Sequence, residues 1–166
     1  MTLIFFSFTG MAQRIALSGS ASIDPPKKFR KAQQSERSSL VTKRFGKTKF
    51  LAKSIQDPEK VYIVDDVILY INSTDVTAKT DALKELKVAF DDTFQGVKDY
   101  SSKIEKIGAK DVFVIDQVSE GLKLYRFTTI NSYKNVVVNG FIQYNPGDEA
   151  KARTILEDLI KGLKFE

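Results

Sequence analysis

Residues 100–144, which read YSSKIEKIGAKDVFVIDQVSEGLKLYRFTTINSYKNVVVNGFIQY, decide the fold of this 166-residue chain. β-Branched and aromatic residues, which favour strands, fill the stretch, and polar breaks occur at Gly108, 119–121 and 131–135. Connections this short force neighbouring strands to pair antiparallel, because a parallel return needs about a dozen residues. The stretch therefore predicts an antiparallel meander with strands at 100–107, 112–118, 122–130 and 136–144.

One amphipathic helix is expected before this meander in the sequence, and another after it. Residues 81–95 place apolar side chains at three- and four-residue steps, and Gly96 ends that helix. After the helix-start signal at 145–148, a second stripe consists of Ala152, Ile155, Leu156, Leu159, Ile160 and Leu163. Upstream, residues 61–72 (VYIVDDVILYIN) indicate one long strand or a hairpin turning at Asp65-Asp66.

The predicted fold class is α+β, with an antiparallel meander sheet and two main amphipathic helices. Strand 112–118 is apolar on both faces, which is typical of a central strand covered on both sides. This favours an α/β/α sandwich, and helices on one main face are the alternative. At this length residues 13–166 are expected to form a single domain. Ile15, Leu17 and Ile23 favour a short strand ending at Pro25-Pro26.

The terminal run at 154–165, TILEDLIKGLKF, preceded by Gly147-Asp148-Glu149-Ala150, resembles the closing helix and tail of the PsbP-like superfamily. The resemblance covers residues 61–166 and includes no catalytic motif. It implies a PsbP-like α/β/α sandwich and a non-enzymatic accessory or binding role. Members of the superfamily resemble one another in fold but serve different partners, so it implies no particular ligand.

The N-terminal residues predict export. Leu3–Phe8 is an apolar run far shorter than the roughly 20 residues of a membrane-spanning helix. Gly10 and Ala12 are small residues at the −3 and −1 positions of a cleavage site before Gln13. We expect residues 1–12 to be a signal peptide, although no basic residue precedes the run, and a buried first strand is the alternative. The mature protein is then periplasmic or extracellular, with no transmembrane segment.

Absent residue types exclude several kinds of site. The chain has no Cys, His or Trp. Thiol nucleophiles, disulfides and thiolate metal sites are therefore excluded, as are imidazole bases and ligands. No glycine-rich nucleotide loop occurs, and Ser-x-x-Lys appears in no favourable context. We expect no cofactor, no metal and no enzymatic activity, although a hydrolase with paired carboxylates stays a minor alternative.

The first third of the chain is basic. Residues 14–60 hold 12 Lys and Arg against 4 Asp and Glu. Within this range, the basic segment at 24–55 is expected to be loosely structured. The candidate binding residues for an anionic surface are Lys27, Lys28, Arg30, Lys31, Lys43, Arg44, Lys47 and Lys49. The alternative is a solvated loop whose interleaved Phe residues pack onto the core. Export argues against nucleic acid as the partner.

The sequence thus leaves two functional hypotheses. The first is an exported, non-enzymatic binding or accessory module with an unidentified protein or ligand partner. The second is a surface-association protein that docks its basic third on an anionic envelope lipid or polysaccharide. Strand tyrosines are expected either to line a ligand cleft or, more commonly, to cover sheet edges: Tyr62, Tyr70, Tyr125, Tyr133 and Tyr144.

Overall fold

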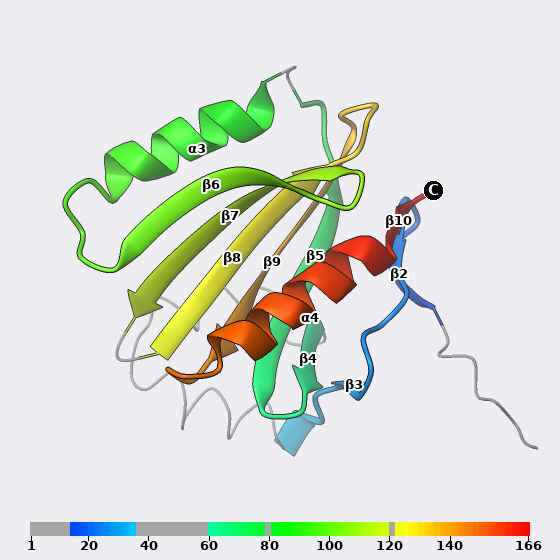
Figure 1. Cartoon of the computed structure of the whole chain (residues 1–166). Coiled ribbons are helices and arrows are strands. Elements are labelled where there is room, and N and C mark those ends of the chain that lie inside the picture. Colours follow the sequence, from blue (N-terminus) through cyan, green and yellow to red (C-terminus); the bar gives the residue numbers. More distant parts are fainter. Residues whose placement is uncertain (1–13, 36–59, 79–80, 120–121) are drawn as a thin grey trace, which may run out of the picture.

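The computed structural model describes residues 14–35, 60–78, 81–119 and 122–166. The complete elements within these ranges are β1 (Ile15–Ser18), β2 (Ala21–Ile23), β3 (Phe29–Lys31), β4 (Val61–Val64), β5 (Val67–Asp75), α3 (Ala82–Thr93), β6 (Tyr100–Ile107), β7 (Lys110–Ser119), β8 (Leu122–Ile130), β9 (Val136–Tyr144), α4 (Glu149–Gly162) and β10 (Leu163–Phe165). The chain has the expected α+β architecture, and Figure 1 shows the large sheet running between α3 and α4.

The large sheet has seven strands in the order β3-β4-β5-β9-β8-β7-β6, and every neighbouring pair is antiparallel. Four of these strands, β6 to β9, are the predicted meander. The 61–72 segment is a hairpin rather than one strand: it turns at Asp65, whose φ of 55° is the left-handed conformation that tight turns require. Strand β5 then returns beside β9, so it lies near the middle of the sheet.

A close approach between β5 and β9 depends on Gly140. A Cβ atom built on Gly140 would lie 2.1 Å from the carbonyl oxygen of Tyr70 and 2.7 Å from the ring of Phe127. Only glycine leaves room for both neighbours, because any side chain starts with that atom. The Phe127 ring can therefore lie over the strand pair at this point.

Helix α4 closes one face of the sheet with the stripe predicted from the sequence. Its buried residues are Ala152, Ile155, Leu156, Leu159 and Ile160. The chain then continues into β10, which pairs antiparallel with β2 in a separate three-stranded sheet of order β1-β2-β10. The backbone amide of Asp24 donates to the carbonyl oxygen of Gly162 at 2.9 Å, which ties the end of α4 to the N-terminal hairpin.

Helix α3 lies on the opposite face, so the chain is the predicted α/β/α sandwich. The sheet residues beneath α4 belong to one large apolar cluster, and a smaller cluster on the other face includes Ile63, Ile68, Tyr70, Leu124 and Phe141. Side chains alternate between the two faces of a strand, which places Phe113, Arg126 and Phe141 on the α3 side.

The N-terminal third contains one strand that the sequence did not predict, and its predicted signal peptide is not tested. The segment at 24–55 is expected to be loosely structured, but within its described part residues 29–31 form β3, which pairs antiparallel with β4. Phe29 contributes to this order because its ring stacks on Tyr62 at a centroid distance of 4.6 Å. The predicted signal peptide at 1–12 lies outside the described residues and stays a prediction.

Candidate functional site

Helix α3 contacts strands β6, β7 and β8 of the large sheet. None of its residues is buried, although its apolar stripe has the same spacing as that of α4. Leu86 and Phe90 are only half-buried, and Phe90 reaches the sheet through Phe113 at a ring-centroid distance of 5.8 Å. Because these apolar side chains are only half-buried, the helix and the sheet do not fill all the space between them.

That space is a cavity of about 510 Å³ between α3 and the sheet, which we call the α3 cavity. Its apolar lining comes from both layers: Tyr70, Val76, Ala78, Ala82, Leu86, Phe90, Phe113, Ile115, Phe127, Ile130, Val137, Gly140 and Phe141. Small-molecule sites are typically cavities of about 300–1,000 Å³ with apolar walls and a few polar groups. The α3 cavity has both properties, so it is the strongest candidate site.

Three polar side chains lie in the sheet at the floor of the α3 cavity. They are Arg126 and Thr128 on β8 and Asn139 on β9. Thr128 and Asn139 are directly paired across the two strands, and Arg126 is two residues from Thr128 on the same face. Burial lowers the pKa of the Arg126 guanidinium, yet an arginine keeps its charge in a protein. The cavity thus combines apolar walls with a cationic floor.

Asp91 joins α3 to the edge strand β6 beside the cavity. Its carboxylate accepts hydrogen bonds from Ser102 Oγ at 2.5 Å and from Tyr100 Oη at 2.9 Å, and it also pairs with Lys87. The hydrogen bonds from Lys87 and Ser102 lower the pKa of Asp91 to about 2. Asp91 is therefore a polar contact that holds α3 beside β6.

Two buried glutamines, Gln117 on β7 and Gln143 on β9, lie on the same face of the sheet as Arg126, one cross-strand pair further along. Gln143 is 1 % exposed, and among the described residues neither its Oε1 nor its Nε2 has a hydrogen-bond partner. Gln117 is also buried, and its Oε1 has no partner in the described part of the chain. Both face Leu124 in the strand register. Unsatisfied buried amides are uncommon in folded proteins, so this face of the sheet retains unused hydrogen-bonding capacity.

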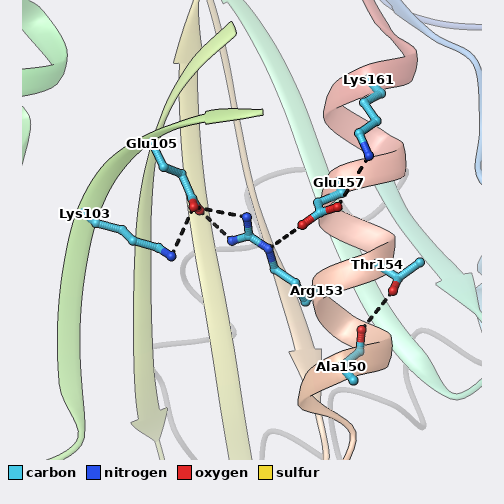
Figure 2. A network of polar contacts seen from close by, with 7 residues as sticks. All are labelled: Lys103, Glu105, Ala150, Arg153, Thr154, Glu157 and Lys161. Atoms are coloured by element: carbon cyan, nitrogen blue, oxygen red, sulfur yellow. Dashed lines mark hydrogen bonds and ion pairs between the residues drawn. The ribbon is translucent and has the colours of Figure 1, made fainter. Parts of the chain in front are cut away.

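The α4 face carries a different kind of polar cluster. Figure 2 shows Arg153 of α4 between two carboxylates: it donates to both oxygens of Glu105 on β6, at 2.5 and 3.1 Å, and to Glu157 at 2.8 Å. Burial favours a raised pKa for Glu105, but the hydrogen bonds from Arg153 and Lys103 outweigh it and lower the pKa. Because all these charges are paired, the cluster is a structural link between α4 and β6.

A smaller pocket of about 270 Å³ adjoins this cluster and contains Ser101, Lys103, Asp116, Tyr125 and Arg153. Burial raises the pKa of Asp116, and its Oδ1 has no hydrogen-bond partner among the residues that the structure describes. Lys103 is paired with Glu105 at 3.1 Å rather than with Ser101. The pocket therefore lacks an activated serine, and its small size makes it the weaker candidate for a ligand.

The predicted basic site is only partly described. Lys27, Lys28, Arg30 and Lys31 are exposed around β3, and Lys28 pairs with Asp65 at 3.0 Å. Lys43, Arg44, Lys47 and Lys49 lie outside the described residues, so the proposed patch stays a prediction. The aromatic residue within the described part, Phe29, is stacked on Tyr62 and does not supply a free ring.

The tyrosines fit the two expected roles only in part. Tyr62, Tyr70 and Tyr144 are buried, so the expectation of edge-covering side chains with solvated hydroxyls is wrong for them. Tyr70 lines the α3 cavity, whereas Tyr133 is 86 % exposed.

Within the described ranges, no helix has the length and apolarity needed to cross a membrane. No group of three or more metal-ligating side chains occurs in that part of the chain either.

Comparison with known proteins gives no match in sequence and several in structure. No protein-family model matches the chain, and no curated protein matches it. Among solved structures, a Bacteroides thetaiotaomicron protein is 16% identical, with a TM-score of 0.56 over 94% of this chain. The present chain spans only 49% of that protein.

Two further solved structures resemble this chain. LpqN, described as involved in cell envelope biogenesis of Mycobacterium tuberculosis, is 10% identical, with a TM-score of 0.53 over 89% of this chain and 86% of LpqN. Cyanobacterial PsbP from Synechocystis sp. PCC 6803 is 10% identical and covers 99% of both chains, with a TM-score of 0.48. At these identities the likeness concerns the fold alone. The antiparallel-sheet sandwich expected from the sequence is thus a fold that this chain shares with the Bacteroides protein and with LpqN.

Proposed function

We propose that this chain is a non-enzymatic binding module of the cell envelope that holds an apolar small molecule in the α3 cavity. The observation that carries the proposal is the cavity itself: about 510 Å³ of space beneath a helix whose apolar stripe remains half-buried. An apolar ligand bound there would bury apolar surface of both the ligand and the cavity. This burial stabilises the complex by roughly 25 cal/mol per Å² of apolar surface removed from water.

Two further points support an envelope role. LpqN, which shares the fold, is described as a protein of cell envelope biogenesis. The N-terminal residues also carry the features of an export signal. Among the described residues, the α3 cavity is lined by neither a carboxylate pair nor a Ser–Lys pair, and this arrangement favours binding over hydrolysis.

The test uses a neutral apolar probe, N-phenyl-1-naphthylamine, whose fluorescence rises when it enters an apolar site. We expect the probe to bind the full chain saturably. We expect this binding to be lost in Leu86→Trp, because Leu86 lines the cavity and the indole ring of tryptophan would fill the cavity. The matched control is Val88→Trp on the same helix. Val88 is 60% exposed and is not part of the lining, so this variant should bind as the wild type does. Equal binding by all three proteins, or by none, would refute the proposal.

The exposed cations around β3 support a second candidate, electrostatic docking on an anionic envelope lipid or polysaccharide. Such docking is screened by salt, because the Debye length falls to about 8 Å at physiological ionic strength. Retention on phosphatidylglycerol vesicles should therefore decrease strongly between low and physiological salt. Retention that is absent, or that does not change with salt, would exclude this candidate.

A further inference from the structure

Two neutral polar side chains at the floor of the α3 cavity are available for hydrogen bonds to a ligand. Thr128 on β8 and Asn139 on β9 line the cavity, and both are only partly buried. Within the described part of the chain, neither the Thr128 hydroxyl nor the Asn139 amide donates or accepts a hydrogen bond. The third polar residue of the floor, Arg126, already has an interaction of its own.

The neighbours of this pair in the sheet do not supply partners for it. Thr128 is opposite Phe113 on β7, whose ring has no polar atom. Asn139 is opposite Asn72 on β5, but the side-chain oxygen of Asn72 already accepts a hydrogen bond from Lys60. A purely hydrocarbon ligand that displaced water from the floor would leave both side chains unsatisfied, which costs free energy. The floor therefore favours a ligand that carries a hydrogen-bonding group.

The geometry of the pair indicates which group this is. Thr128 and Asn139 lie directly opposite each other in the strand register, and the Cβ atoms of such a pair are about 4.5–5.5 Å apart. One ligand atom between them can therefore reach both side chains. A hydroxyl oxygen can accept a hydrogen bond from Thr128 Oγ1 while it donates one to Asn139 Oδ1. An ether oxygen can only accept, so it leaves the Asn139 oxygen without a donor.

The rest of the cavity suits an apolar body attached to that hydroxyl group. The wall that α3 contributes consists of Ala82, Leu86 and Phe90, and the described lining contains no Asp or Glu. A few polar groups within apolar walls are what orients a ligand in a typical small-molecule site. The Thr128–Asn139 pair would thus fix one end of the ligand, while its apolar part lies under α3.

We propose that the ligand of the α3 cavity is an uncharged alcohol, whose hydroxyl group binds between Thr128 and Asn139 and whose apolar body lies beneath α3. This inference rests on the proposed function, since it names the ligand class of the same cavity. It assigns Thr128 and Asn139 as the residues that distinguish an alcohol from an ether or a hydrocarbon of the same size.

The test compares two isomers, octan-1-ol and 1-methoxyheptane, as competitors that displace N-phenyl-1-naphthylamine from the full wild-type chain. We expect octan-1-ol to bind about tenfold more tightly, because only the alcohol donates a hydrogen bond to Asn139. Asn139→Leu should bind the two isomers equally, and Thr128→Val should lose part of the preference. The control Thr154→Val changes an exposed threonine of α4 outside the lining and should keep the full preference.

The outcomes separate the two proposals. Equal affinities of the wild type for the two isomers, or displacement of the probe by neither, would overturn the role of the Thr128–Asn139 pair and leave the proposed function intact. Failure of the probe itself to bind the wild type would overturn both. If Asn139→Leu does not fold, Thr128→Val decides, because it keeps the β-branched shape that strands favour. An undiminished preference for octan-1-ol in that variant would contradict the assignment.

Discussion

Replacing Gly140 by Ala should strongly destabilise the protein, because the new methyl group has no space. It would lie 2.1 Å from the Tyr70 carbonyl oxygen, about 1.3 Å short of the 3.4 Å at which ordinary contact begins. It would also lie 2.7 Å from the ring of Phe127, which is 1 % exposed and cannot move into solvent. The strain therefore falls on the pairing of β5 with β9, where Gly140 is opposite Ile71.

The expected loss of stability depends on how far β5, β9 and the Phe127 ring must shift to make room for the methyl group. Overpacking a close-packed core costs about 1–3 kcal/mol, and each backbone hydrogen bond lost on separating the strands adds about 1 kcal/mol. We expect Gly140→Ala to lower the free energy of unfolding by about 4 kcal/mol. For a domain of this size that corresponds to a fall in Tm of about 10 °C.

The assay is urea denaturation followed by far-ultraviolet circular dichroism, with Gly19→Ala as the matched control. A Cβ atom on Gly19 meets no atom within 4 Å, and its backbone is not left-handed. The control should stay within about 0.5 kcal/mol of the wild type. If Gly140→Ala also stays within about 1 kcal/mol, the close approach of β5 and β9 at this position is refuted.

Three other predictions concern the polar clusters and the N-terminus. Arg153→Ala should lower the free energy of unfolding by about 2 kcal/mol, since the largely buried Glu105 carboxylate loses both hydrogen bonds from Arg153 and keeps only Lys103. The exposed Lys161→Ala should cost less than about 1 kcal/mol, and equal urea midpoints for the two variants would contradict this. The lowered pKa of Asp91 means that its ionised form stabilises α3 above about pH 4 and that this contribution is lost between about pH 4 and 2. Hydrogen exchange of the α3 amides should accelerate across that window in the wild type but not in Asp91→Asn, and identical pH profiles would exclude the contact. Mass spectrometry of the native protein should find a chain beginning at or near Gln13, and an intact Met1 would refute the export signal.

The meander was predictable from the sequence because its determinants are local. Strands 100–107, 122–130 and 136–144 have the expected bounds, since short polar turns between apolar runs fix both the strand ends and the antiparallel pairing. The stripe of α4 was equally visible, and its five buried residues were all in the predicted set.

The α3 cavity was not predictable, since an apolar helical stripe has the same spacing whether it packs on a sheet or covers a cavity. The distance between α3 and the sheet depends on tertiary contacts such as those of Asp91 with Ser102 and Tyr100. One local signal for the site did exist. Leu124, Arg126 and Thr128 alternate on one face of a strand bounded by two others, so Arg126 is a charge at a position expected to be covered.

The most direct test of a binding cavity beneath α3 is methyl NMR of the full chain during titration with N-phenyl-1-naphthylamine. The account predicts saturable shifts for the methyl groups of Leu86, Ile115 and Val137, which line the cavity, and none for Ile155 and Leu159, which α4 buries on the opposite face. Unchanged cavity methyls, or shifts concentrated at Ile155 and Leu159, would contradict it.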